Sequence, residues 1–377
     1  MKITVQTTTF SRELFKAQGI ANAKSTLPVL QNILLEATAD GRLTIKVTDL
    51  ETSLSTEISG NDVQVHEPGR LTIRAKDLYE TVKNLKGESL TLEKDDQHWG
   101  RLTSGTVRAR FVGVNPDEYP AIPSVDTTEF AAIPTDRFIR AADLVYNAIS
   151  KDPSRPHMCG AFFHVASSGK LGFVATDGHR LNQAVFDFSG DLPEEIKKGV
   201  IVPRKGIEDL RRSIDLTQET IGVALSGSTI VFKQQSSLLF VRLIDGNFPP
   251  YENVIPADVE ENKAIIDRSM FLDRIKLVSI FCRQKSRSMR IALEDGVCII
   301  SAHDNETGEC EERLPIAYSG PNIRAGFNHQ YVQEVLSVLR GPEFSFEIKD
   351  ALKPAIIHEL DTKEDEDSVF VVMPMRL

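Results

Sequence analysis

The segment Asp40–Asp49, with the sequence DGRLTIKVTD, decides how this chain is organised. It begins with an Asp-Gly turn, continues as a strand of alternating apolar and polar residues, and ends on a Thr-Asp pair. About 128 residues later the pattern returns at Ser168–Asp177 (SGKLGFVATD), and a looser copy occupies Asp295–Asp304 (DGVCIISAHD). Solenoid repeats recur every ~20 to 50 residues, whereas this interval is as long as a domain. The 377 residues are therefore predicted to form three similar domains.

Two helical patterns accompany each copy of the strand. One precedes the strand and the other follows it, each with apolar residues at helical spacing. The preceding stripes are Phe10, Leu14, Ala17; Phe138, Ala142, Val145; and Phe271, Ile275, Val278, and the following stripes are Leu78, Val82, Leu85; Ile207, Leu210, Ile214; and Val332, Leu336, Leu339. Each repeat is predicted to be an α+β unit with antiparallel sheets. The predicted domains are 1–127, 128–258 and 259–377.

The composition is that of a globular protein, with 41% hydrophobic and 26% charged residues. No apolar run approaches the ~18 residues of a membrane span, and the amino-terminal residues lack the apolar centre of a signal peptide. Four cysteines are scattered without a Cys-x-x-Cys pair, which is typical of reduced thiols. These features predict a cytoplasmic location.

The net charge of −10 argues against nucleic acid binding if the chain is taken as a whole. The predicted helical stretches have the opposite charge balance, with 23 Lys and Arg against 11 Asp and Glu. These stretches are 10–26, 74–86, 134–155, 203–212, 267–290 and 327–340. The rest of the chain then carries a net charge of −22. This segregation predicts a surface that faces a polyanion, although an ordinary preference for basic residues at helix ends would also produce part of it.

Asp177 and His179 form the strongest candidate for catalysis, since a carboxylate near an imidazole can act in general-base chemistry. No Gly-x-Ser-x-Gly elbow or nucleophilic Cys motif accompanies them. The first repeat has Thr48 and Asp49 at the equivalent positions but no His, so turn formation explains the shared Thr-Asp pair without chemistry. We therefore predict no catalytic residues.

Other ligand motifs fail on spacing. Ser168–Lys170 lacks the upstream glycine and the following hydroxyl of a phosphate-binding loop, and Gly169 instead fits a hairpin turn. His303, Asp304 and Glu306 have no second cluster of ligands at a recognisable spacing. No metal site and no cofactor are predicted.

The carboxyl terminus is unusual because the apolar segment Val371–Leu377 follows directly on an acidic loop. Two methionines beside a proline make an adaptable surface that can accept several partners. A final strand over Ser368–Val372 that buries its own tail is the structural alternative.

Four segments together resemble the bacterial DNA polymerase III beta subunit family, the sliding clamps: Thr176–Leu181, Val202–Gly206, Asp245–Pro256 and Met373–Leu377. The resemblance covers the whole chain, including the threefold repeat. It implies a non-enzymatic processivity factor in which two chains form a six-domain ring around double-stranded DNA, with two helices per domain lining the hole. Twelve helices spaced roughly 9 to 10 Å apart would leave a hole of about 25 Å, wide enough for a duplex.

The resemblance also implies three sets of residues. A groove for short peptides of DNA polymerase III, the clamp loader and repair polymerases would comprise Met158, Thr176, Gly178, His179, Arg180, Leu181, Pro249, Val254, Val371, Val372, Met373, Pro374, Met375, Arg376 and Leu377. The DNA-facing residues would be Lys24, Lys76, Lys151, Arg155, Arg204 and Lys205, and the homodimer interface would include Arg108, Phe111, Ile280 and Phe281. Two departures from the family are Glu252 and Asn253 where a basic residue is common, and Pro156 and His157 in place of an aromatic pair.

Two other functions stay open at this point. The first is a DNA-processing enzyme that uses Asp177 and His179, which would lose turnover on substitution of the histidine. The second is a three-domain scaffold that binds no DNA, which native mass and DNA retention would distinguish from a clamp.

Overall fold

The computed structural model describes residues 1–21, 27–95, 97–123, 125, 129–256, 262–282 and 287–376. Their contacts divide the chain into two compact units. Unit one comprises Met1–Thr135, Gly190–Pro193 and Lys205–Leu243, and unit two comprises Asp136–Ser189, Glu194–Arg204 and Ile244–Leu377. No helix in the described part of the chain is long and apolar enough to cross a membrane.

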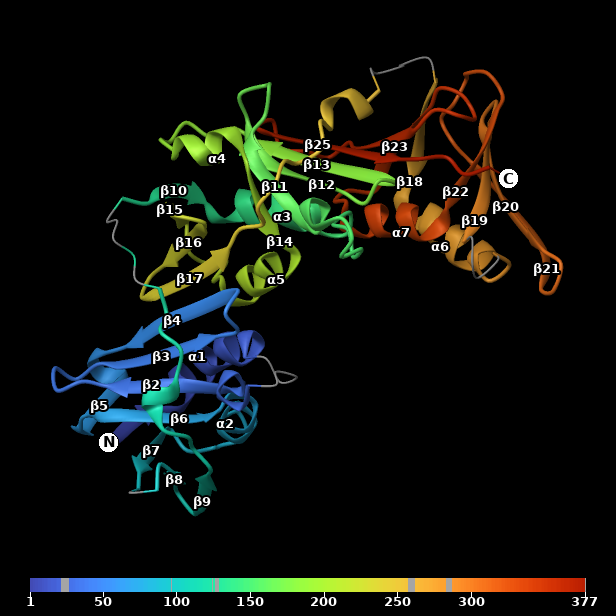
Figure 1. Ribbon diagram of the computed structural model, residues 1–377. Coiled ribbons are helices and arrows are strands. Elements are labelled where there is room, and N and C mark those ends of the chain that lie inside the picture. Colours follow the sequence, from blue (N-terminus) through green and yellow to red (C-terminus); the bar gives the residue numbers. More distant parts are fainter. Residues whose placement is uncertain are drawn as a thin grey trace. The chain divides into compact units, whose positions relative to one another are not determined.

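Unit one contains two antiparallel sheets (Figure 1). The five-stranded sheet has the order β5 (Val63–Glu67), β1 (Lys2–Gln6), β7 (Ser89–Lys94), β8 (Gly100–Ser104), β9 (Val107–Phe111). The eight-stranded sheet has the order β10 (Ala131–Pro134), β15 (Thr220–Ser226), β16 (Thr229–Gln234), β17 (Ser237–Arg242), β4 (Thr52–Ile58), β3 (Leu43–Thr48), β2 (Asn32–Ala37), β6 (Gly69–Arg74). Because β17 pairs with β4, strands of the first and second repeats form one continuous sheet.

The helices of unit one are α1 (Thr7–Ile20), α2 (Ala75–Val82) and most of α5 (Arg204–Ser213). Helix α1 packs against α2 and against strands β3 and β4. The stripe Phe10, Leu14 and Ala17 is fully buried in this contact. The predicted helical face therefore covers the predicted strand, as amphipathic periodicity requires.

Unit two repeats this arrangement (Figure 1). Its eight-stranded sheet has the order β14 (Val200–Pro203), β11 (Gly160–Val165), β12 (Leu171–Thr176), β13 (Arg180–Phe186), β25 (Glu366–Val372), β24 (Ala355–Glu359), β23 (Glu343–Ile348), β18 (Lys263–Asp267). Its four-stranded sheet has the order β21 (Gly308–Pro315), β20 (Val297–Asp304), β19 (Ser288–Glu294), β22 (Ile323–Asn328). The pairing of β13 with β25 joins the second repeat to the third.

The helices of unit two are α3 (Thr135–Tyr146), α4 (Glu194–Lys198), α6 (Arg268–Ser279) and α7 (His329–Val338). Phe138 of α3 contacts the rings of Phe163 and Phe173 edge-on, with centroids 5.3 and 5.2 Å away. Helix α6 packs against α7, and Phe271 contacts Phe344 in the core of the third repeat. Short 3-10 turns complete the description: η1 (Pro28–Gln31), η2 (Gly60–Asp62), η3 (Pro116–Glu118), η4 (Pro156–Met158) and η5 (Glu252–Val254).

The predicted α+β class with antiparallel sheets is confirmed, since every strand pairing among the described residues is antiparallel. The hairpin glycines recur as predicted: Gly41, Gly169 and Gly296 have φ of 86°, 81° and 68° in equivalent turns. Glycine adopts this left-handed conformation without the clash that a Cβ would cause. The boundaries predicted at 127/128 and 258/259 lie outside the described residues and stay a prediction.

Five of the six predicted helical stretches were too long. Helix α3 ends at Tyr146 rather than at residue 155, and α6 ends at Ser279, with residues 288–290 already in strand β19. The six main helices carry only 12 Lys and Arg against 9 Asp and Glu, so most of the basic excess lies in the segments that follow them. The prediction failed because basic residues continue past the last apolar position of most stripes.

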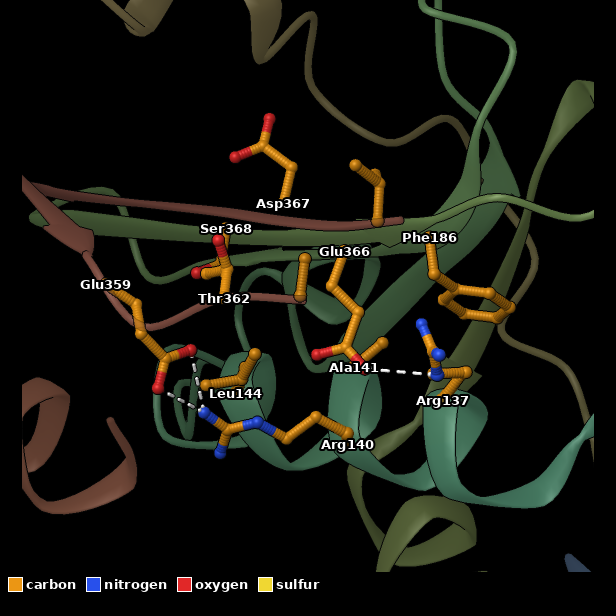
Figure 2. A pocket seen from close by; sticks show the side chains of 12 residues that line it. Arg137, Arg140, Ala141, Leu144, Phe186, Glu359, Thr362, Glu366, Asp367 and Ser368 are labelled. Atoms are coloured by element: carbon orange, nitrogen blue, oxygen red, sulfur yellow. Dashed lines mark hydrogen bonds and ion pairs between the residues drawn. The ribbon is translucent and has the colours of Figure 1, made fainter. Parts of the chain in front are cut away.

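Ion pairs attach α3 to the strands of the third repeat (Figure 2). Arg140 Nη2 lies 2.8 and 2.9 Å from the two carboxylate oxygens of Glu359, and its Nη1 donates to the Val338 carbonyl at 2.6 Å. Arg137 pairs with Asp365 and, through Nε at 3.2 Å, with Glu366. The cavity among these side chains has about 10 Å³, room for one water at most. These contacts hold α3 beneath the junction of β13 with β25.

Candidate functional site

A groove of about 260 Å³ lies beside the junction of β13 with β25 in unit two. Its wall is mostly apolar. It is lined by Met158, Thr176, Gly178, Arg180, Leu181, Pro249, Pro250, Tyr251, Val254, Val371 and Met373. An apolar concavity with a few polar groups at its rim is the usual form of a ligand site.

The floor of the groove follows from strand alternation. Leu181 and Val371 are register partners on β13 and β25, and they form a buried cluster with Val174 and Tyr251. Successive side chains of a strand point to opposite faces, so Val372 faces away from Leu181 and Val371. Val372 is fully buried and does not line the groove. This corrects the predicted placement of Val372 in the groove.

One side of the groove is a tight turn between β12 and β13. The Thr176 hydroxyl donates to the Arg180 carbonyl at 2.7 Å and accepts from the Gly178 N–H at 3.1 Å. Asp177 Oδ1 accepts from the backbone N–H groups of His179 and Arg180 at 2.9 and 3.1 Å. Gly178 has a φ of 88°, which favours glycine. The Asp177 carboxylate thus holds a turn, as the structural interpretation predicted.

Arg180 lines the groove, and its guanidinium is engaged by neighbouring groups. Its Nε lies 3.1 Å from Asp177 Oδ2, and its guanidinium also pairs with Glu334 and donates to the Asn147 carbonyl. The guanidinium carbon stands 4.3 Å from the ring centre of Tyr331 on α7. With its side chain 8% exposed, Arg180 fixes the turn to α7. Arginine has a planar fork that suits such multiple contacts.

A second part of the groove lining comes from the segment Phe248–Val254. Phe248 stacks on Phe162 of β11, with ring centroids 4.9 Å apart and planes within 6°. Pro250 and Tyr251 line the groove, although neither was predicted. The run Phe-Pro-Pro-Tyr at 248–251 was the available signal, because prolines stiffen a segment while the flanking rings anchor it.

The carboxyl-terminal tail is divided between two places. The Met373 N–H donates to the His179 carbonyl at 2.9 Å, which extends the β13–β25 ladder by one step and leaves the Met373 side chain 37% exposed at the groove. The Met375 N–H donates to the Gly326 carbonyl of β22 at 2.8 Å. His179, Pro374, Met375 and Arg376 do not line the cavity, and Leu377 lies outside the described residues.

The predicted DNA-facing residues differ in how free their charges are. Lys76, Lys151 and Arg155 are exposed, the last within 3.8 Å of Asp152, and Lys24 lies outside the described residues. Arg204 is half-buried over the Tyr146 ring, at 4.1 Å, and donates to the Ile149 carbonyl at 3.1 Å.

Lys205 is committed to internal ion pairs. Its Nζ lies 2.5 Å from Asp209 and 2.8 Å from Asp49. Burial acts to lower the pKa of Lys205, but the two carboxylates outweigh it and raise the pKa. The charges of Lys205 and Arg204 are therefore engaged in contacts within the protein, which leaves them less available to bind a polyanion.

The predicted interface residues lie on two open surfaces. Arg108 is exposed and Phe111 half-buried on β9, an edge strand of the five-stranded sheet. Ile280, directly after α6, is 66% exposed, and Phe281 is half-buried. An exposed apolar side chain beside a helix end and an unpaired strand edge are both features of association surfaces.

The groove holds no catalytic arrangement in the described residues. Asp177 is occupied by two backbone N–H donors and by Arg180 Nε, and its hydrogen bond to His179 is made with the backbone N–H. Across the described part of the chain, no three His, Cys, Asp or Glu side chains are grouped to hold a metal ion. The geometry favours binding over chemistry.

Comparisons with known proteins account for the whole chain. Family models of the DNA polymerase III beta subunit match its amino-terminal domain at residues 1–123, its central domain at 132–250 and its carboxyl-terminal domain at 252–376. The beta sliding clamp of Caulobacter vibrioides is 32% identical over 387 residues, with both chains fully covered. The DNA polymerase III beta subunit structure from Pseudomonas aeruginosa is 30% identical with a TM-score of 0.88, both chains again being fully covered. The sliding clamp structure from Bacillus subtilis is 26% identical with a TM-score of 0.88, covering all of this chain and 99% of its own. The chain belongs to the DNA polymerase III beta subunit family, the bacterial sliding clamps.

Proposed function

We propose that this sliding clamp works as a head-to-tail homodimeric ring that encircles double-stranded DNA and tethers partner proteins through the groove beside β13 and β25. The partners would be DNA polymerase III, the clamp loader and repair polymerases, in the cytoplasm. Each ring would contain six domains, three from each chain, divided at 127/128 and 258/259. The observation that carries the proposal is the apolar groove itself, which is open and has no catalytic group at its floor.

The groove suits a short extended peptide with apolar side chains. Leu181, Val371 and Val254 supply apolar surface, and Met373 can adjust its rotamer to different side chains. Turn Thr176–Arg180 and segment Phe248–Val254 both contribute to its lining, and each is fixed by its own contacts. A largely preformed groove of this kind binds a peptide with little reorganisation.

The ring would close through two edge strands, β9 of the five-stranded sheet and β21 of the four-stranded sheet. Strand β9 carries Arg108 and Arg110, whereas strand β21, the outer strand of the four-stranded sheet, carries Glu309, Glu311 and Glu312. Pairing β9 of one copy with β21 of another would satisfy both edges and bring opposite charges together. Exposed Ile280 and half-buried Phe281 would add apolar contact.

Native mass measured by light scattering tests the ring. The expected value is twice the 41.9 kDa of one chain. Arg108→Glu combined with Arg110→Glu should shift the mass toward the monomer because like charges would face each other. Arg101→Glu on neighbouring strand β8 is the matched control, and its mass should stay dimeric. A wild-type monomer at micromolar concentration would overturn the ring.

DNA contact would be electrostatic and independent of sequence. Lys76, Lys151 and Arg155 are the exposed candidates, while the half-buried Arg204 and Lys205 would contribute mainly to the positive potential. A few lysine and arginine contacts to phosphate give weak binding that falls steeply with salt. Such contacts carry no base readout, which suits a ring that slides.

A further inference from the structure

A chain of polar contacts runs beneath one side of the groove. Gln183 Nε2 donates to the Tyr251 hydroxyl at 3.3 Å, and that hydroxyl lies 3.2 Å from His164 Nε2. The other imidazole nitrogen, Nδ1, lies 3.0 Å from the Val165 carbonyl. His164 is 5% exposed and Tyr251 is 6% exposed, so both polar ends are buried.

The donors and acceptors in this row of polar contacts, from Gln183 through Tyr251 to His164, are consistent with one arrangement of the hydrogens. A carbonyl can only accept, so Nδ1 of His164 carries the hydrogen that goes to Val165. Nε2 is then the acceptor for the Tyr251 hydroxyl, which in turn accepts from the Gln183 amide. Every group is satisfied only while the imidazole is neutral.

The same imidazole belongs to a stack of rings. Phe162 and His164 project from one face of β11, and their ring centroids are 4.5 Å apart. Phe248 stacks on the far side of Phe162, and Tyr251 meets His164 edge-on at 5.6 Å. Opposite His164 in register is Gly172, which has no side chain to compete for the space. The stack anchors both ends of segment 248–251.

We propose that His164 is a positioning residue of the groove, whose neutral imidazole holds Tyr251, and through it segment Phe248–Val254, in the peptide-accepting position. Protonation of the imidazole releases this segment and weakens peptide binding. The inference rests on the groove being a peptide site, as proposed above. Tyr251 is the link, since it is one of the residues that line the groove and its hydroxyl contacts His164.

Protonation would disturb the site for two reasons. Nε2 would become a donor, so the Tyr251 hydrogen would lose its buried acceptor. A positive charge would also be buried among aromatic rings. Burial lowers the pKa of His164. The hydrogen bond to the Val165 carbonyl and the negative charge of Glu252 on η5 both act to raise this pKa, but burial outweighs them. Burial, with Glu252 adding to it, raises the pKa of Tyr251 to about 12, so the hydroxyl keeps its proton.

The sign of the pH effect follows from this lowered pKa. We call the site closed while His164 contacts Tyr251, and open once segment Phe248–Val254 is released. Because the pKa of His164 is lowered in the closed site, the imidazole binds a proton more readily once the site opens or unfolds. The closed form is therefore fully favoured above the ordinary histidine pKa of about 6.5 and loses stability as pH falls below it. Peptide affinity should decrease in the same direction.

The test measures the affinity of a fluorescein-labelled peptide, copied from the clamp-binding segment of the replicative polymerase, from about pH 8 to about pH 5.5 by anisotropy. His164→Ala should weaken binding about fivefold at pH 8, the effect of one buried hydrogen bond. His164→Gln keeps an amide oxygen as the acceptor and does not titrate, so it should restore most of that affinity. Relative to His164→Gln, the wild type should lose about tenfold on acidification.

Two further variants separate His164 from other titrating groups. Tyr251→Phe removes the hydroxyl and should abolish most of the difference between wild type and His164→Gln at low pH. His303→Gln changes an exposed histidine on β20 and should keep the wild-type pH profile. Thermal melting and native mass confirm that each variant folds; if His164→Ala fails to fold, the His164→Gln comparison decides alone.

Equal pH profiles for wild type and His164→Gln would overturn the inference, as would unchanged affinity in a folded His164→Ala. Failure of the wild type to bind the peptide at pH 8 would instead overturn the proposed groove. The two failures are therefore distinguishable.

Discussion

The turns Thr48–Thr52 and Thr176–Arg180 are two copies of one structure with different uses. In the first, the Thr48 hydroxyl donates to the Thr52 carbonyl at 3.2 Å and accepts from the Leu50 N–H at 3.0 Å. Asp49 Oδ1 accepts from the N–H groups of Glu51 and Thr52 at 3.0 and 2.7 Å. The second turn, at Thr176–Arg180, makes each of these bonds at the equivalent positions.

The difference lies in the side chains that leave the turn. Leu50 has a φ of 79° and is 56% exposed, whereas Gly178 has a φ of 88° and lines the groove. A Cβ on Gly178 would lie 3.1 Å from Arg155 Nη1 and 3.7 Å from Met158 Cε. The comparison teaches that the repeat supplies a rigid turn, and that one glycine and the added tail adapt the second copy to form a groove.

Removing Met373–Leu377 should have the largest effect on peptide binding. The tail is one of the two features that distinguish the second turn from the first, which has no such tail beside it. The groove would lose Met373 and its contact with the His179 carbonyl, so peptide binding should fall below detection in an anisotropy titration. Native mass should remain that of a dimer, since the tail is part of neither β9 nor β21, and Met375 contacts β22 at the other edge of the four-stranded sheet from β21. A truncated chain that elutes as a monomer would mean that the tail is structural.

Gly178→Leu transfers the residue of the first turn to the second. Leucine would project into the groove and would hold a positive φ at a cost of about 1 to 2 kcal/mol. Peptide affinity should fall more than about tenfold, which corresponds to about 1.4 kcal/mol of binding free energy. Leu50→Gly is the matched exchange and should leave peptide affinity unchanged. Equal affinities for wild type and Gly178→Leu would place the peptide elsewhere.

Asp49→Ala and Asp177→Ala test whether the turns are mechanically equivalent. Each substitution removes an acceptor for two backbone N–H groups, so each should lower the free energy of unfolding by about 1 to 2 kcal/mol in denaturant titrations. Asp177→Ala alone should also weaken the peptide. If Asp177→Ala abolished an enzymatic turnover instead, the structural interpretation of the turn would be wrong.

Leu50→Gly should have the smallest effect. It relieves a side chain from the left-handed conformation but adds entropy to the unfolded chain, so the free energy of unfolding should rise by less than about 1 kcal/mol. Thermal denaturation of the full chain measures the change. A clear loss of stability would show that exposed Leu50 has a packing role.

The threefold repeat could be predicted because it depends on short-range sequence patterns. A hairpin glycine determines the turn in which it lies, as at Gly41 and Gly169. An apolar stripe determines one helix, as at Phe10, Leu14 and Ala17. Family membership confirms the predicted sliding clamp and, with it, a processivity factor rather than an enzyme. Helix ends were predicted poorly because charged residues run on past the apolar stripe.

The site was predictable where it follows the chain and not where distant segments meet. Thr176, Gly178 and Arg180 of the turn and Met373 of the tail line the cavity, whereas His179 and the rest of the described tail do not. That this groove binds a peptide stays a prediction. Val372 was misplaced because strand register decides which face a side chain takes. Tyr251 and His164 were missed because their contact joins segments 87 residues apart, and no periodicity reports such a pairing.

Retention on DNA tests the central claim of an encircling ring most directly. The protein is loaded onto nicked circular DNA, and the bound fraction is measured before and after a restriction enzyme linearises the circle. A closed ring should stay on the circle at a salt concentration that breaks simple electrostatic contacts, and should slide off once the DNA has ends. Equal retention on the circular and linear DNA would contradict the account.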